Sequence, residues 1–164
     1  MSQPNIQIDG LVANPISLAF TDLATMPETS QVHDVSRFAS GKKGDAVTLE
    51  SLLSLVDPQP EANYLTLHAN RDDFHVSIPL EAVRSEGLLV YKLGDSPLEV
   101  SQGGPFRFLI RDFTACHSSE LDDCANVKFL DRIELTHRKQ RDTRPQSEAE
   151  HKALHAREME NHDF

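Results

Sequence analysis

The sequence is poor in several residue types. These shortages restrict the class of protein to which it can belong. Its 164 residues include no tryptophan and two cysteines, Cys116 and Cys124. Two cysteines are too few for the disulfide framework of a small secreted domain. Lys and Arg number 16 against 26 Asp and Glu, so the formal net charge is −10. This balance disfavours binding to the phosphate backbone of a nucleic acid, because such binding needs clustered Lys and Arg.

Long apolar runs are also missing. No run approaches the roughly 18 residues of a membrane-spanning helix. The opening residues, MSQPNIQIDG, lack the basic and apolar regions of a secretory signal. We therefore expect a cytoplasmic protein with neither a membrane nor a nucleic acid as partner.

The remaining composition fits one globular domain followed by a charged tail. The length is sufficient for a sizeable core, and 38% of the residues are hydrophobic. We expect a folded domain over 1–136 and a tail over 137–164 that is helical or partly disordered. In the tail, Ser147 and Glu150 have the spacing of a capping box. His151 and His155 share a face of that helix at a spacing that can bind metal. We interpret the helix as solvated or as docking a protein partner, with metal binding as the alternative.

Alternating and compact apolar runs predict a mainly β, α+β fold with few short helices. A helix is expected over 48–56, capped by Thr48, and a shorter one over 19–27 with Thr21 as the cap. Another helical turn or two over 79–87 is expected to be closed by Gly87. The expected strands lie at 6–12, 64–69, 74–80, 87–93, 105–111 and 127–135.

Several stretches resemble the molybdopterin-binding domain of the sulfite oxidase family. They occur in the family's order and span roughly residues 6–136. The most specific is LLVYKLGDSPLEVSQGGPFRFLI, which combines a turn, a glycine pair and an arginine at set spacing. The others are IQIDGLVANPISLAFTDLATMP, TLESLL, SIPLEAV and VKFLDRIEL.

This resemblance implies a pterin cofactor carrying molybdenum and a set of residues that hold it. Arg107 matches the family's cofactor-binding arginine, and Lys128 would place a point charge on the cofactor's phosphate. The glycine pair would let the backbone approach the ligand closely. The alternative is that Arg107 is an ordinary outward-facing strand residue. The implied cofactor-binding residues are Gly103, Gly104, Arg107, Asn126, Val127 and Lys128.

The loop beginning VHDVSRF departs from the family pattern. Counted back from Phe38, the position of the family's molybdenum-ligating cysteine falls on Asp34, beside His33; a register shifted by two would place it on Ser36. Three alternatives remain: Asp34 ligates the metal through oxygen, a thiolate of Cys116 or Cys124 replaces the missing sulfur, or the domain is catalytically silent. Oxo-transfer as the family performs it is therefore in doubt.

Other residues also bear on function. Gln102 stands where the family's sulfite-oxidising members carry histidine. Cys116 and Cys124, seven residues apart with His117 adjacent, do not have a standard zinc spacing. His68 and His75 lie on adjacent predicted strands, where they can face each other across a hairpin, either as ligands or satisfied by backbone carbonyls.

The function expected from the resemblance is that of a molybdopterin-binding, oxidoreductase-like domain, catalytically altered or silent because of Asp34. If the domain is active, it would be a molybdenum-pterin oxidoreductase other than a typical sulfite oxidase. The alternative is a non-catalytic module of the same fold that binds a ligand or a partner.

Overall fold

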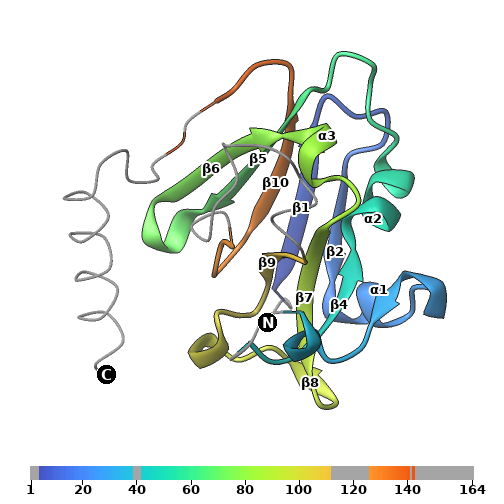
Figure 1. Cartoon of the computed structure of the whole chain (residues 1–164), viewed down its shortest axis with the longest axis vertical. Helices are drawn as coiled ribbons and strands as arrows, with labels where there is room; N and C mark the ends of the chain where they lie inside the picture. The colour runs from blue at the N-terminus through green and yellow to red at the C-terminus, as the bar shows by residue number, and fades with distance from the viewer. Residues whose placement is uncertain (1–3, 39–41, 112–125, 141, 143–164) are drawn as a thin grey trace.

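Two β-sheets make up most of the protein in the computed structural model, which describes residues 4–38, 42–111, 126–140 and 142 (Figure 1). In the first sheet β1 pairs in parallel with β10 and every other pair is antiparallel. Its strands, in spatial order, are β2 (Ile16–Ala19), β1 (Asn5–Gly10), β10 (Arg132–Thr136), β5 (Tyr64–Ala69) and β6 (Phe74–Pro79).

The second sheet is antiparallel throughout and is centred on the longest strand, β7. Its path runs through β3 (Gln31–Val32), β4 (Asp45–Thr48), β7 (Gly87–Leu93) and β8 (Ser96–Pro97), and β9 (Arg107–Ile110) also pairs with β7. The helices are α1 (Phe20–Ala24), α2 (Leu49–Val56) and α3 (Leu80–Val83). Single 3-10 turns are η1 (Glu28–Ser30), η2 (Val35–Arg37), η3 (Asn70–Asp72) and η4 (Val100–Gln102).

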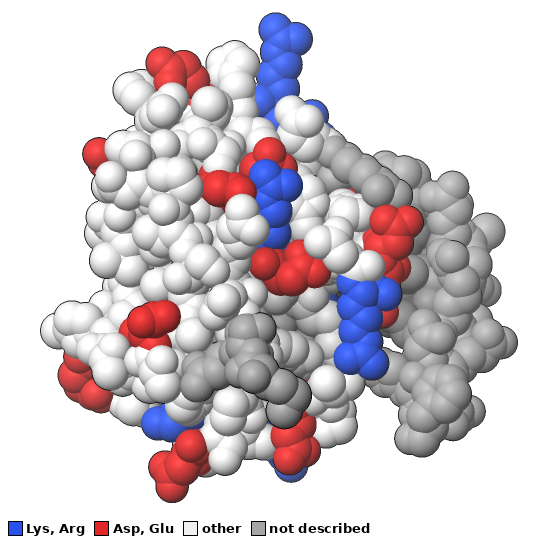
Figure 2. Space-filling view, turned by 180° about the vertical axis from the view of Figure 1, so that it is seen from behind, with Lys and Arg blue, Asp and Glu red and all other residues white. Residues whose placement is uncertain are grey.

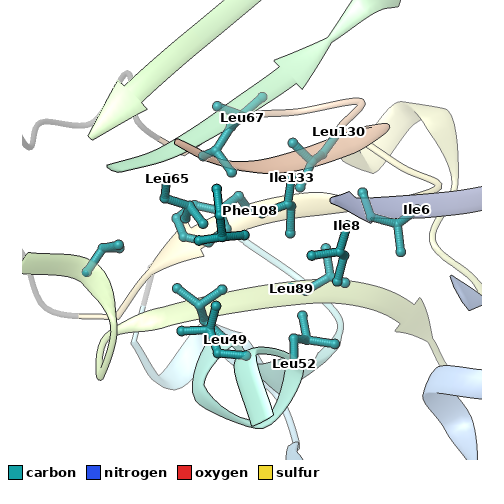
Figure 3. Packing of buried hydrophobic residues seen from close by; sticks show 14 of the residues in the cluster. Ile6, Ile8, Leu49, Leu52, Leu65, Leu67, Leu89, Phe108, Leu130 and Ile133 are labelled. Atoms are coloured by element: carbon teal, nitrogen blue, oxygen red, sulfur yellow. The ribbon is translucent and has the colours of Figure 1, made fainter. Parts of the chain in front are cut away.

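The main core lies between the two sheets and is closed on one side by α2. Alternate residues of the first sheet, such as Leu65 and Leu67 of β5, point toward Phe108 of β9 (Figure 3). Leu49 and Leu52 of α2 pack against the same cluster. These side chains are no more than 1% exposed, and each such aliphatic or aromatic group stabilises the fold by roughly 1.5–3 kcal/mol on burial.

A second, smaller core covers the other face of the second sheet. It contains Val32, Val35, Ala46, Leu88, Val90, Leu98 and Leu109. The strands β4, β7 and β9 are therefore buried on both faces, which explains why their sequences read as continuous apolar runs rather than as alternating ones. Arg107 shares this second face with Leu109, because residues two apart on a strand point the same way.

The structure confirms the mainly β fold and most of the predicted elements. Thr48 caps α2, since its hydroxyl oxygen accepts a hydrogen bond from the amide of Ser51 at 3.2 Å. All the residues predicted to form the apolar face of this helix are buried, namely Leu49, Leu52, Leu53 and Val56.

Three local predictions were wrong. Thr21 is not the cap of α1, because the helix begins after Ala19, whose amide donates to the Asp22 carboxylate at 2.8 Å. Gly87 does not close α3; it is the first residue of β7, where a Cβ would come within 2.8 Å of Leu49. The run 127–135 is a strand only from residue 132, because Phe129 adopts a φ of 56°, outside the extended region.

The strands β2, β3 and β4 were not predicted. Each has only two to four residues, too few for alternation to be recognised. No helix in the described part of the chain is long and apolar enough to cross a membrane. The tail predicted over 137–164 is described only at residues 137–140 and 142, where no helix is present; its other residues lie outside the described part of the chain.

Candidate cofactor site

The site begins at a tight turn before β9. The 3-10 turn η4 ends at Gly103, whose φ of 87° lies in the left-handed region that glycine adopts without strain. The next amide, of Gly104, donates to the carbonyl of Glu99 at 2.9 Å. A cis peptide bond joins Gly104 to Pro105. This turn determines where Arg107, at the start of β9, emerges.

A second segment, residues 126–130, is fixed along the turn and β9 by hydrogen bonds. The amide of Phe129 donates to the carbonyl of Gly103, and that of Leu130 to the carbonyl of Phe106, both at 2.8 Å. The amide of Phe108 donates to the carbonyl of Val127 at 2.8 Å. These bonds place the side chain of residue 128 over the glycine turn.

Asn126 and Val127 hold this segment rather than pointing to a shared opening. The side-chain oxygen of Asn126 accepts a hydrogen bond from the amide of Ile110 at 2.9 Å. Val127 is fully buried in the main core. Whether either residue also contacts a cofactor remains a prediction.

Arg107 and Lys128 meet at Gly103. A Cβ placed on Gly103 would lie 3.1 Å from Cγ of Lys128 and 3.3 Å from Nη1 of Arg107, so both side chains flank the glycine. Arg107 is only 4% exposed, and its Nη1 donates to the carbonyl of Gln102 at 3.1 Å. Arg107 is therefore not an outward-facing, solvated strand residue. The two predicted cations lie close together.

Gly104 has a different structural role from its neighbour. A Cβ on Gly104 would lie 2.0 Å from the carbonyl oxygen of Leu98 and 2.9 Å from that of Glu99. Glycine is required there because the backbone at residue 104 packs directly against the backbone of Leu98 and Glu99. Its expected approach to a ligand remains a prediction.

Strand register relates Arg107 to the loop of Asp34. Val32, Ala46, Val90 and Arg107 are successive partners across β3, β4, β7 and β9. Adjacent strands lie about 4.8 Å apart, so three steps separate β3 from β9 by about 14 Å. Asp34 follows β3 by two residues. The two predicted parts of the site therefore lie on one sheet, three strands apart.

Asp34 is exposed and is held by its neighbours. It has a φ of 59°, a conformation that aspartate adopts more readily than most residues. Its carboxylate accepts hydrogen bonds from the hydroxyl of Ser36 and, at 3.2 Å, from the amide of Ser36. Its own amide donates to Asp45 at 2.8 Å. Asp45 was not predicted, because it contributes from 11 residues away in the sequence.

A pocket of about 390 Å³ adjoins Asp34. It is lined by Asp34, Ser36, Lys42, Lys43, Gly44, Asp45, Leu93 and Gly94. Acidic and basic groups are mixed in it, and neither Arg107 nor Lys128 belongs to the lining. The Asp34 side and the Arg107 side are therefore separate features of the described structure.

The two sides differ in how well they fit a molybdenum-pterin cofactor. Arg107 and Lys128, close together at a glycine, suit an anionic group such as a phosphate. On the other side Asp34 offers a carboxylate that is already engaged by Ser36. A carboxylate is a hard ligand and does not replace a thiolate donor. The anion-binding side fits the cofactor, and the metal-binding side does not fit thiolate ligation.

The hydroxyl of Ser36 lowers the pKa of the Asp34 carboxyl below its ordinary value of 3.8, and the Ser36 amide and Arg37 act in the same direction. Because the pKa is lowered in the folded state, the associated stabilisation is present above pH 3.8 and is lost as pH falls through the lowered value. We expect Ser36→Ala to raise the Asp34 pKa, measured by NMR titration of the carboxyl carbon.

A matched control is Ser54→Ala. Its hydroxyl donates to the carbonyl of Glu50 in α2, away from the loop of Asp34, so the Asp34 pKa should not change. If Ser36→Ala also leaves that pKa unchanged, the hydroxyl of Ser36 does not hold the carboxylate.

The remaining predicted residues differ in where they lie. His33 is exposed; its Nε2 pairs with Glu28 at 2.5 Å, and its Nδ1 lies 4.0 Å from the Asp45 carboxylate that holds Asp34. Gln102 borders Arg107 and accepts its hydrogen bond through the backbone carbonyl. Cys116, His117 and Cys124 lie outside the described residues, so the substitute-thiolate alternative is not tested. Within the described ranges no group of three or more His, Cys, Asp or Glu is arranged to hold a metal.

His68 and His75 face each other across the β5–β6 hairpin, as predicted. They are direct cross-strand partners, and their Nδ1 atoms are 2.8 Å apart. Their carboxylate partners, Glu134 and Asp73, were not predicted. Glu134 comes from the neighbouring strand β10, whereas Asp73 lies only two residues before His75, so the sequence alone could have indicated Asp73.

Known proteins resemble this chain in sequence and in fold. One similar protein is the uncharacterized oxidoreductase YuiH of Bacillus subtilis (strain 168), 28% identical over 112 residues, covering 65% of this chain and 56% of that protein. A similar fold occurs in the sulfane dehydrogenase SoxCD of Paracoccus pantotrophus, with a TM-score of 0.59 and 20% identity. That match covers 83% of this chain and 39% of the other. The chain thus spans little more than half of the length of the first of these proteins and well under half of the second.

The model of the oxidoreductase molybdopterin binding domain family matches residues 43–144, more than half of the chain. This range includes the turn of Gly103, Arg107 and Lys128. Asp34 lies before it, so its assignment to the cysteine position depends on the resemblance of its own loop. The match shows that the chain belongs to the oxidoreductase molybdopterin binding domain family.

Proposed function

We propose that this domain binds the anionic part of a molybdopterin-type cofactor through Arg107 and Lys128, and that its redox chemistry is altered or absent. The observation that carries the proposal is the meeting of these two cations at Gly103. Family membership supplies the class of ligand. When bound, such a cofactor supplies oxo-transfer redox chemistry, for which this chain has no thiolate at Asp34.

The distribution of charge supports a local anion site rather than a general one. On the face shown in Figure 2, basic side chains stand singly among acidic ones and form no continuous basic patch. The net charge of −10 repels anions at long range. Binding therefore depends on short contacts from Arg107, which is buried, and Lys128, which is half-buried. Such contacts select one anionic group in a fixed position.

The state of Asp34 favours the catalytically silent alternative over direct ligation of metal by oxygen. Its carboxylate is exposed and hydrogen-bonded to the hydroxyl and amide of Ser36. Ligation would require these bonds to be exchanged for a metal bond. A non-catalytic module that binds the pterin or a related ligand needs no such exchange. The proposal therefore favours this module.

The test is the pterin content of the purified full chain, measured as fluorescent oxidised pterin per protein after expression with molybdate. We expect Lys128→Met to lower retained pterin about 10-fold, because a charged hydrogen bond contributes about 1.5–3 kcal/mol. Arg107→Lys keeps the charge but loses the planar two-pronged geometry, and it should also lower retention.

The matched control is Arg84→Met, which removes an exposed cation paired with Glu81 beside α3. It should leave pterin retention unchanged. If Lys128→Met retains as much pterin as Arg84→Met, or the unmodified chain retains none, the proposed function is wrong.

A further inference from the structure

The outer face of the first sheet carries a histidine pair that the proposed function does not use. His68 on β5 and His75 on β6 are cross-strand partners with ring centroids 5.0 Å apart. Their side chains are 14% and 7% exposed. They are sheltered but can still be reached from solvent.

Each ring is oriented by a carboxylate at its far nitrogen. Nε2 of His68 lies 2.9 Å from Glu134, and Nε2 of His75 lies 3.0 Å from Asp73. An ionised carboxylate only accepts hydrogen bonds, so each Nε2 carries a proton. Both rings therefore turn Nδ1 toward the same point.

The two Nδ1 atoms are 2.8 Å apart. Two bare lone pairs would repel at this distance, and two N–H groups would clash, so a proton or another cation between the two nitrogens stabilises the pair. The point between the rings is thus a site for one small cation.

Histidines that bind a metal commonly have this same arrangement. Such a histidine donates its outer N–H to a carboxylate, which fixes the ring and raises the basicity of the ligating nitrogen. Both rings have this partner here. Zinc–nitrogen bonds of 2.0–2.1 Å at a tetrahedral angle place two nitrogens about 3.3 Å apart. The two nitrogens must therefore separate, and both rings must turn, to admit the ion.

The surrounding charges also favour a cation. Glu134 and Asp73 contact the rings directly, and Asp9 is the cross-strand partner of Glu134 on β1. Arg132 is the cross-strand partner of His68, and it is paired with Asp9 at 2.9 Å and with Glu134 at 3.4 Å. Its charge is therefore offset by these two carboxylates.

We propose that His68 and His75 form a site for a borderline divalent metal such as Zn²⁺, bound through both Nδ1 atoms, with water completing the coordination. The site is independent of the cofactor site at Arg107. Imidazole nitrogen is a preferred ligand for this class of metal.

The test titrates the chelator-treated chain with Zn²⁺ by calorimetry near neutral pH. We expect one equivalent to bind, because the two Nδ1 atoms converge on one point. In ¹⁵N spectra of the histidine rings, Zn²⁺ should shift Nδ1 of both His68 and His75 while both Nε2–H groups remain.

Variants separate this site from other zinc-binding groups of the chain. Either His68→Asn or His75→Asn should abolish the binding of this one equivalent of Zn²⁺. A combined variant should still bind one equivalent of Zn²⁺ when it replaces Cys116, Cys124, His151 and His155. Binding that persists without His68 and His75, or no binding by the unmodified chain, would overturn the proposal.

A milder variant covers the case in which the histidine variants do not fold. Asp73 is 71% exposed and has a φ of 49°, a conformation that asparagine also tolerates. Asp73→Asn should fold normally and weaken Zn²⁺ binding about 10-fold, the lower end of the effect of losing an orienting carboxylate. Unchanged affinity in this variant would contradict the role of Asp73.

Discussion

Replacing Gly104 by alanine is expected to destabilise the protein by about 3 kcal/mol or more. The added Cβ would lie 2.0 Å from the carbonyl oxygen of Leu98 and 2.5 Å from its carbon. Both are backbone atoms and cannot move aside as a flexible side chain would. The turn before β9 must shift instead. Urea denaturation would measure the effect as a lower transition midpoint.

Gly94→Ala is the matched control. Gly94 also has a positive φ, of 66°, but no atom lies within 4 Å of the position of its Cβ. This substitution adds the strain of a left-handed alanine without a collision, and should cost about 1 kcal/mol. If Gly104→Ala costs no more than Gly94→Ala, the turn does not approach Leu98 as closely as the structure has it.

The Gly104 variant also tests how Arg107 is positioned. The amide of Gly104 and the carbonyl of Gly103 are both hydrogen-bonded, to Glu99 and Phe129 respectively. A shift of the turn therefore moves Arg107 and residue 128 relative to each other. Any Gly104→Ala protein that still folds should retain less pterin than Gly94→Ala.

Local sequence rules identified those elements whose signals are contained within the element. Helix α2 has its cap, Thr48, and its apolar spacing within one stretch of nine residues. The pairing of His68 with His75 followed from one short hairpin. The run after Lys128 was misread, because the left-handed Phe129 interrupts a sequence that is apolar enough for a strand.

The residues of the candidate site were predicted from the family resemblance. Their hydrogen-bond partners became clear only in the structure. Arg107 and Lys128 were identified from the family pattern, and no local rule indicates that they meet at Gly103. Their proximity depends on hydrogen bonds between segments about 20 residues apart. The partners Asp45 and Glu134 were missed for the same reason: register between strands is fixed by packing across the sheet.

Asp34→Cys is expected to have the largest functional effect. We expect the unmodified chain to oxidise sulfite more slowly than roughly 1 per second, the lower end of ordinary enzymatic rates. The variant places a soft thiolate donor where the resemblance has the family's metal ligand. After expression with molybdate, it should retain several-fold more molybdenum per chain than the unmodified protein, as measured by elemental analysis.

Asp34→Ala separates the gain of a thiolate from the loss of the carboxylate. Both substitutions remove the bonds to Ser36, and both place a less suited residue at a φ of 59°, so their stabilities should fall by a similar amount, about 1 kcal/mol. Only Asp34→Cys should gain molybdenum. Equal metal content in the two variants would show that residue 34 is not the position of the missing ligand. Pterin retention by Asp34→Ala should match that of the unmodified protein, because Arg107 lies three strands away on the same sheet and Lys128 lies beside it at Gly103.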